Sequence, residues 1–327
     1  MALHEYLKGV FPVAPTPLMD DETLDPGGMH HLLNYYIASR CHGVLVLGSG
    51  GEFPYFTARE KLQIVKTAVK AIHGRIPLLV GVGFNSARET LAFVEEAGVL
   101  DIDGFLVIQP TYYPVAFPEM KELMLRVCGK SKKPVLYYHY PQMTGLFFSR
   151  KEMSELLSIK ELAGMKESSM NMSDTRAFCE LTQNRTYSLL TGNSFFLLKS
   201  LQLGAQGAIC QIPAFSPEVV VNCYEAWISG ERELANHRQE LIQRMIPVLN
   251  TFGLPAAIQK TGLKVLSRFP SLMRSRNVSR HAVVKEILHQ QGHPVRSRVR
   301  SPLPQISVQD SEKIRIFLSD LKSEVSI

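Results

Sequence analysis

The feature that most constrains how this chain can fold is an alternation of short apolar runs with amphipathic helical stretches over its first two-thirds. Short apolar runs between helices are typical of strands buried on both faces of a parallel sheet. Eight runs fit this description: Val10–Ala14, Gly43–Leu47, Leu78–Val82, Gly104–Ile108, Val135–Tyr138, Leu162–Lys166, Tyr187–Leu190 and Gly207–Cys210. Eight strand-then-helix units favour a closed barrel over an open doubly wound sheet. The predicted fold class is therefore α/β, a (β/α)8 TIM barrel with a C-terminal helical extension.

Helices are predicted between the strands and after the last one. Those between strands include Thr57–Ile72, Ser86–Ala97, Phe117–Cys128, Arg150–Leu157 and Ser173–Gln183. After about residue 217 the strand pattern ends, and the predicted helices are Pro217–Ser229, Glu231–Phe252, Pro255–Leu266, His281–His289 and Asp310–Leu321. We therefore expect a barrel domain at residues 1–228 and a C-terminal helical region at residues 229–327, with a basic insertion at 267–300.

The basic character of the chain is concentrated in one stretch. Nine basic residues and one acidic residue lie between Lys264 and Arg300, which gives this stretch +8 in a chain of net charge +6. Such a cluster can bind nucleic acid, but its arginines are not regularly interleaved with aromatic residues for base stacking. We favour a solvated or inter-subunit face, and nucleic acid is not an expected partner.

The cysteines and the hydropathy pattern indicate a cytoplasmic protein. Five cysteines without CxxC spacing argue against a disulfide framework and a structural zinc site. No apolar run reaches the roughly 18 residues of a membrane-spanning helix, and the N-terminus lacks a secretory pattern. No His, Asp and Glu cluster with ligand spacing lies at the strand ends, so no catalytic metal is expected.

Lys166 is the most informative polar residue, because it ends the sixth predicted strand. In a barrel of this type the active site lies at the C-terminal ends of the strands. Burial there favours the neutral amine, and a neutral amine can attack a ketone to form a Schiff base. A structural lysine at the barrel rim accounts for this one residue equally well.

Other strand ends supply groups that suit a 2-oxo acid. The Ser49 hydroxyl and the backbone N–H groups of Ser49 and Gly50 are suited to hold a carboxylate. The phenols of Tyr112 and Tyr138 are candidates for the proton transfers that imine chemistry needs, although either one alone fits a rim tyrosine. We expect His139 to be structural, because strand alternation points it away from its neighbour Tyr138.

Four motifs in order resemble the dihydrodipicolinate synthase / N-acetylneuraminate lyase family of class I, pyruvate-dependent aldolases. They are Gly48-Ser49-Gly50-Gly51-Glu52, Tyr138-x-x-Pro141-x-x-Thr144-Gly145, Gly164-Met165-Lys166-Glu167 and Gly204-Ala205-Gln206-Gly207-Ala208-Ile209. The resemblance covers roughly residues 8–260. It implies a homo-oligomer, dimer or tetramer, that needs no metal or organic cofactor, because the covalent imine on Lys166 is itself the electron sink.

The resemblance also implies roles for individual residues. Lys166 would form the Schiff base with pyruvate and Tyr138 would be the general acid/base. Ser49 and a tyrosine from a neighbouring subunit would complete a proton relay; Tyr112 is the candidate, with Tyr113 left open. The pyruvate carboxylate would bind at Ser49 and Gly50, near the Ile209 backbone. Ser168, Gly192 and Met143 are further substrate-binding candidates.

Departures from the family motifs limit the substrate. Met143 stands where lysine-pathway synthases carry an arginine, so synthase activity is disfavoured. Ser194 and Phe195 stand where sialate lyases bind a sugar through an acidic pair, and Ser49 to Pro54 resembles 4-hydroxy-2-oxoglutarate aldolases. We expect a lyase that cleaves a 4-hydroxy-2-oxo acid or 2-oxo-3-deoxy sugar acid to pyruvate and an aldehyde. The alternatives are synthase-type condensation of pyruvate with an aldehyde, and a non-catalytic 2-oxo-acid sensor.

Overall fold

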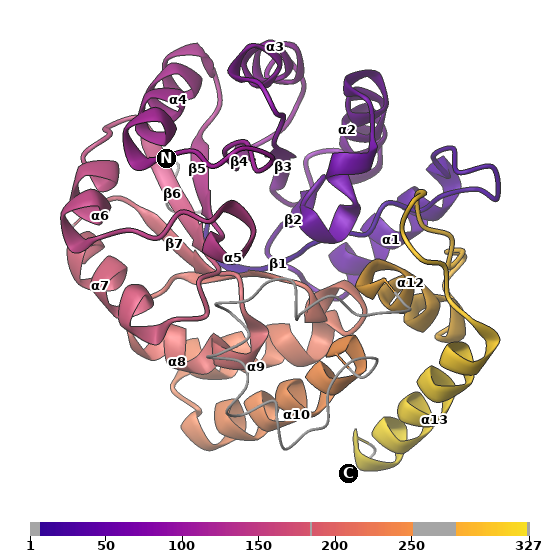
Figure 1. The fold of residues 1–327 in the computed structure, drawn as a ribbon. Coiled ribbons are helices and arrows are strands. Elements are labelled where there is room, and N and C mark those ends of the chain that lie inside the picture. Colours follow the sequence, from indigo (N-terminus) through magenta and orange to yellow (C-terminus); the bar gives the residue numbers. More distant parts are fainter. Residues whose placement is uncertain (1–6, 184, 251–278, 326–327) are drawn as a thin grey trace.

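The computed structural model describes residues 7–183, 185–250 and 279–325, and it has eight parallel strands in a barrel surrounded by helices (Figure 1). The strands are hydrogen-bonded in the order β1-β8-β7-β6-β5-β4-β3-β2, and a parallel bridge between Val13 and Leu45 joins β1 to β2. Their bounds are β1 (Gly9–Pro12), β2 (Val44–Val46), β3 (Leu78–Val82), β4 (Gly104–Val107), β5 (Val135–His139), β6 (Leu162–Glu167), β7 (Ser188–Thr191) and β8 (Gly207–Cys210). The predicted barrel is confirmed.

Helices follow the strands and pack around the outside of the barrel (Figure 1). Their starts are encoded locally: Thr57 and Ser149 each form a reciprocal capping box with the glutamate three residues later. The helices are α1 (Pro26–Ala38), α2 (Ala58–Ile72), α3 (Ala87–Ala97), α4 (Phe117–Lys130), α5 (Pro141–Thr144), α6 (Arg150–Leu157), α7 (Met172–Thr182), α8 (Leu197–Gln202) and α9 (Pro217–Ser229). Short 3-10 turns follow several strands, including η2 (Ser49–Gly51) after β2.

The apolar residues form two layers separated by the strands. Alternate strand residues point inward and fill the barrel with one cluster, which includes Phe11, Leu79, Leu136 and Tyr138. The others point outward and pack against the helices in a larger cluster. This alternation is the strand period of two, and it decides which polar side chains can reach the open end of the barrel.

The C-terminal region adds α10 (Arg232–Asn250), α12 (Arg280–Gln290) and α13 (Val308–Val325) beside the barrel (Figure 1). The predicted helix Pro255–Leu266 and most of the basic insertion lie outside the described residues. The connector at residues 291–307 contains no helix or strand and passes the N-terminus of α1, where Arg296 pairs with Asp25 at 3.2 Å. Among the described residues, no helix has the length and apolar character that crossing a membrane requires.

Candidate active site

A cavity of about 200 Å³ opens at the C-terminal ends of the strands. Six of the predicted catalytic and substrate-binding residues lie in its wall: Ser49, Gly50, Tyr138, Lys166, Ser168 and Gly192. They come from the ends of four strands: β5, β6 and β7 are neighbours in the barrel, and β2 lies apart from them. The parallel register explains why Tyr138 and Lys166 lie side by side, since Tyr138 on β5 is the register partner of Lys166 on β6.

Lys166 is buried in an environment that favours its neutral form. Its residue surface is 3% exposed, and its Nζ lies 4.2 Å from the centroid of the Tyr138 ring. Burial lowers the pKa of Lys166 from 10.5 to about 7, and the nearby Cys210 thiol opposes this shift. No carboxylate pairs with its ammonium within the described part of the chain. A substantial fraction of the amine is therefore an unprotonated nucleophile at neutral pH.

Tyr138 lies within reach of a second hydroxyl. The Ser49 hydroxyl donates to the Tyr138 hydroxyl across 3.4 Å, and the Tyr140 ring stacks on the Tyr138 ring at a centroid distance of 5.4 Å. Burial raises the pKa of Tyr138 to about 12, while the hydrogen bond from the Ser49 hydroxyl acts in the opposite direction. Tyr138 is thus a protonated phenol at neutral pH, with a hydroxyl neighbour that can relay its proton.

Gly192 is small because two active-site side chains pass close to it. A Cβ at this position would lie 1.7 Å from the Ser168 Oγ and 3.0 Å from the Lys166 Cε. The buried Ser168 hydroxyl has no hydrogen-bond partner among the described residues. It therefore remains available for a bound molecule beside the lysine.

Three other predicted site residues lie elsewhere. Met143 is 60% exposed and does not line the cavity in this chain, so its expected substrate contact stays a prediction. The short helix α5 turns it outward and buries Gln142, which donates to the Ser169 carbonyl. The Ile209 side chain is buried inside the barrel, and the expected role of its backbone beside the carboxylate stays a prediction.

Tyr112 lies on the surface of the single chain, 76% exposed and in edge-to-face contact with Tyr113. It does not line the cavity in this chain. The expected relay role of Tyr112 involves a neighbouring subunit, so that role stays a prediction. His139, in contrast, is fully buried against Phe148, and its expected structural placement is confirmed.

The C-terminal region contributes residues that the sequence did not reveal as part of the site. Arg280 lines the cavity, and the ring of His281 contacts the Ser49 carbonyl. The sequence predicted His281 only as the first residue of the helix His281–His289, with no role in the site. Its contact spans 232 positions of sequence and has no motif or periodicity that would reveal it.

The described part of the basic cluster is not simply a solvated face. Lys285 is fully buried and pairs with Glu52, which corrects the expectation for that residue. Arg296, Arg298 and Arg300 all pair with acidic side chains of the barrel domain. Four of the five basic residues in the described part of the cluster are therefore paired with acidic side chains of the barrel domain.

No group of three or more His, Cys, Asp or Glu side chains within the described ranges has the geometry of a metal site.

Comparison with known proteins identifies the chain's relatives. The family model described as "Dihydrodipicolinate synthetase family" matches residues 6–281. The chain belongs to this family. It is accordingly an enzyme of the pyruvate-dependent aldolase and lyase class.

Relatives in the dihydrodipicolinate synthetase family include DapA-like lyases and sugar-acid aldolases. An uncharacterized DapA-like lyase of Halobacterium salinarum is 34% identical over 236 residues, which are 72% of this chain and 77% of that protein. YagE of Escherichia coli K12, described as a putative 2-dehydro-3-deoxy-D-gluconate aldolase, is 27% identical over 96% of this chain and 97% of its own length. The crystal structure of YagE with pyruvate has a TM-score of 0.84 at 25% identity and covers 96% of this chain and 98% of that one.

Proposed function

We propose that this protein is a Schiff-base aldolase that cleaves a 4-hydroxy-2-oxo acid or a 2-oxo-3-deoxy sugar acid to pyruvate and an aldehyde. The observation that carries the proposal is Lys166, buried without a counter-ion in the described part of the chain and 4.2 Å from the Tyr138 ring. The sugar-acid alternative is supported by YagE and by YjhH of Escherichia coli K12, described as a probable 2-dehydro-3-deoxy-D-pentonate aldolase and 27% identical over 226 residues.

In the proposed mechanism the neutral amine of Lys166 attacks C2 of the oxo acid to give a carbinolamine. Tyr138 supplies the proton with which the former ketone oxygen leaves as water, and an iminium remains. Deprotonation of the C4 hydroxyl then breaks the C3–C4 bond, with its electron pair taken up by the iminium as an enamine. The aldehyde departs, the enamine is protonated at C3, and water releases pyruvate from Lys166. No metal or organic cofactor enters this sequence.

The carboxylate of the substrate would bind at the loop after β2. The N–H groups of Ser49 and Gly50 donate no hydrogen bond within the described residues, and both residues line the cavity. Backbone N–H groups together with the Ser49 hydroxyl suit a carboxylate. The Ser168 hydroxyl, free of a described partner, would contact the reacting end of the substrate.

Arg280 limits the choice of aldehyde. It is the second cationic side chain in the cavity wall beside Lys166, and the wall contains no carboxylate among the described residues. An aldehyde fragment with an anionic group would gain a charge-assisted contact there. The same arginine gives the rival condensation of pyruvate with a carboxylate-bearing aldehyde some support, although Met143 does not face the cavity.

A homo-oligomer, dimer or tetramer, in the cytoplasm is part of the proposal. The exposed aromatic pair Tyr112 and Tyr113 supports a subunit contact, because adjacent exposed aromatic rings are typical of interfaces. Five free cysteines, all buried, support a reducing compartment. Light scattering of the purified protein tests the assembly; a monomer would remove the basis for a relay that includes Tyr112.

Pyruvate release from a panel of substrates tests the function. The panel contains 4-hydroxy-2-oxo acids with and without a second carboxylate and 2-oxo-3-deoxy sugar acids, each assayed with wild type and Lys166→Ala. We expect turnover by wild type only, with Arg280→Gln raising KM selectively for substrates that carry the second carboxylate. No pyruvate from any member, with the variant and wild type equally inactive, would favour the non-catalytic 2-oxo-acid sensor.

A further inference from the structure

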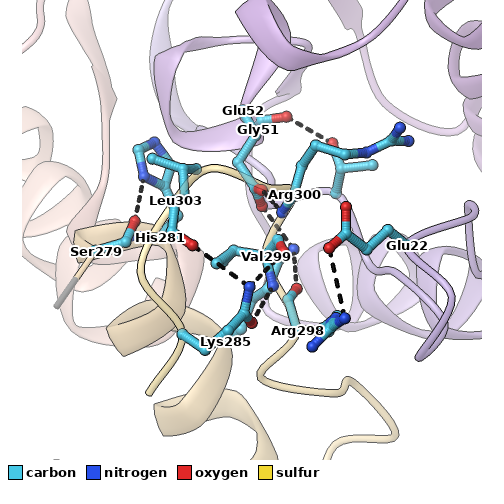
Figure 2. A network of polar contacts seen from close by, with 12 residues as sticks. Glu22, Gly51, Glu52, Ser279, His281, Lys285, Arg298, Val299, Arg300 and Leu303 are labelled. Atoms are coloured by element: carbon cyan, nitrogen blue, oxygen red, sulfur yellow. Dashed lines mark hydrogen bonds and ion pairs between the residues drawn. The ribbon is translucent and has the colours of Figure 1, made fainter. Parts of the chain in front are cut away.

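The C-terminal region reaches back to the loop that would bind the substrate carboxylate (Figure 2). We call residues 48–52, which follow β2, the carboxylate loop. Helix α12 contacts this loop twice: His281 contacts Ser49 near the start of the loop, and Lys285 contacts Glu52 at its end. These contacts join parts of the chain more than 230 residues apart. They bear on how the loop keeps its shape.

The first contact is a buried ion pair at the end of the carboxylate loop. The Lys285 Nζ lies 2.6 Å from the Glu52 Oε1, and both side chains are fully buried. The Arg300 backbone N–H donates to the other Glu52 oxygen at 2.7 Å, and Lys285 also donates to the Arg298 carbonyl at 2.6 Å. Removing one partner of such a pair leaves an uncompensated buried charge. The pair therefore ties α12 and its connector firmly to the loop.

The second contact fixes a single peptide unit of the loop. The His281 Nε2 lies 2.7 Å from the Ser49 carbonyl oxygen, and its Nδ1 lies 2.9 Å from the Ser279 hydroxyl. A carbonyl oxygen only accepts, so the His281 proton is on Nε2, and Nδ1 accepts from Ser279. Burial lowers the pKa of His281, which favours this neutral form. The imidazole is thus held in one tautomer, with its donor aimed at Ser49.

The peptide unit between Ser49 and Gly50 is planar, so the contact of His281 also affects the Gly50 N–H. In a trans peptide the C=O and N–H of one unit point in opposite directions, so a donor that holds the Ser49 oxygen also sets the direction of the Gly50 N–H. Gly50 lines the cavity, and its N–H has no partner among the described residues. The Ser49 hydroxyl, on the same residue, contacts Tyr138 at 3.4 Å. The His281 imidazole therefore orients one of the two expected carboxylate donors, the Gly50 N–H, and it contacts the residue whose hydroxyl begins the proton relay.

We propose that His281 is a positioning residue for the aldolase reaction, acting through the Ser49–Gly50 peptide, and that the Glu52–Lys285 pair holds α12 where His281 can do this. The inference rests on the proposed function, because it assigns the loop to the substrate carboxylate. His281 itself does not touch the substrate in this account. Its loss should weaken pyruvate binding and leave the nucleophile in place.

A pair of amide variants tests the positioning role. The Nε2 of glutamine in His281→Gln can reach the Ser49 oxygen, whereas the shorter amide in His281→Asn ends near the place of Nδ1 and cannot. The control is Val284→Ala, a buried position on the same helix whose side chain packs in the apolar core. For each full-length protein, borohydride trapping on Lys166 is measured against pyruvate concentration, together with the urea midpoint.

We expect His281→Asn to raise the half-saturating pyruvate concentration about fivefold, as the loss of one neutral hydrogen bond implies, and to reach full trapping at saturation. His281→Gln should restore most of the affinity. Val284→Ala should lower the urea midpoint and leave the half-saturating concentration unchanged. An unchanged value in His281→Asn, or the same rise in Val284→Ala, overturns the positioning role. Absence of trapping in wild type overturns the imine chemistry instead.

Discussion

Replacing Lys166 by methionine should abolish catalysis and at the same time stabilise the fold. The reason is the cost of keeping this amine in a dry site. Its pKa falls from 10.5 to about 7 on folding. Each pKa unit corresponds to about 1.4 kcal/mol. The shift therefore costs about 5 kcal/mol of folding free energy at low pH, where the folded protein must either bury a charge or release a proton.

The sign of the pH dependence follows from proton counting. Between pH 7 and pH 10.5 the unfolded lysine binds a proton that the folded one has released, so wild-type stability from this group rises with pH. The penalty is about 4 kcal/mol at pH 7 and is nearly gone at pH 10.5. Methionine has no charge to desolvate and a similar length, so Lys166→Met should escape the penalty.

Urea unfolding of wild type and Lys166→Met at pH 7 and pH 10 measures the difference. We expect the variant to be more stable by several kcal/mol at pH 7, with most of this gain lost at pH 10. Lys151→Met, at an exposed position of α6, is the matched control and should show no such change. Equal stability of wild type and Lys166→Met at pH 7 would refute the reasoning, because Lys166 would then pay no desolvation cost.

Three further changes test neighbouring parts of the site. Tyr138→Phe should slow borohydride trapping of pyruvate without preventing it and lower kcat by about 10²–10⁴-fold, as loss of a general acid/base does; wild-type kcat in this variant would exclude the role. Gly192→Ala should abolish trapping with an unchanged circular dichroism spectrum, because the new Cβ would lie 1.7 Å from the Ser168 Oγ; full activity would mean that the wall can shift. Lys285→Met should lower the free energy of unfolding by about 3–5 kcal/mol, since it leaves Glu52 unpaired and buried. Adding Glu52→Gln should recover part of that loss, and no recovery would contradict the assignment of the loss to the unpaired charge.

Much of the fold and half of the site followed from local pattern. The strand β8 spans Gly207–Cys210 as predicted, because a short apolar run between two helices is typical of a buried strand. The proximity of Lys166 and Tyr138 could be predicted from the sequence, since both end predicted parallel strands and both point inward by strand alternation. The loop that contains Ser49 and Gly50 could be assigned to the same site, because the C-terminal ends of all eight strands lie on one face of the barrel.

The remaining parts of the site depend on contacts that sequence periodicity does not encode. Met143 faces solvent because α5 makes one helical turn after β5, and the direction of that turn follows from packing around Gln142. His281 and Lys285 contact the carboxylate loop only when α12 packs beside the barrel, next to the end of β2. Tyr112 is the opposite case, because its predicted role involves a second chain.

Mapping the pyruvate adduct on the chain tests the central claim most directly. Wild type and Lys166→Ala are each incubated with pyruvate and borohydride, digested, and their peptides identified by mass spectrometry. The account predicts one reduced pyruvate adduct, on the peptide that contains Lys166, and none in the variant. An adduct on another lysine, or no adduct on a folded wild-type protein, would contradict the assignment of Lys166 as the Schiff-base residue.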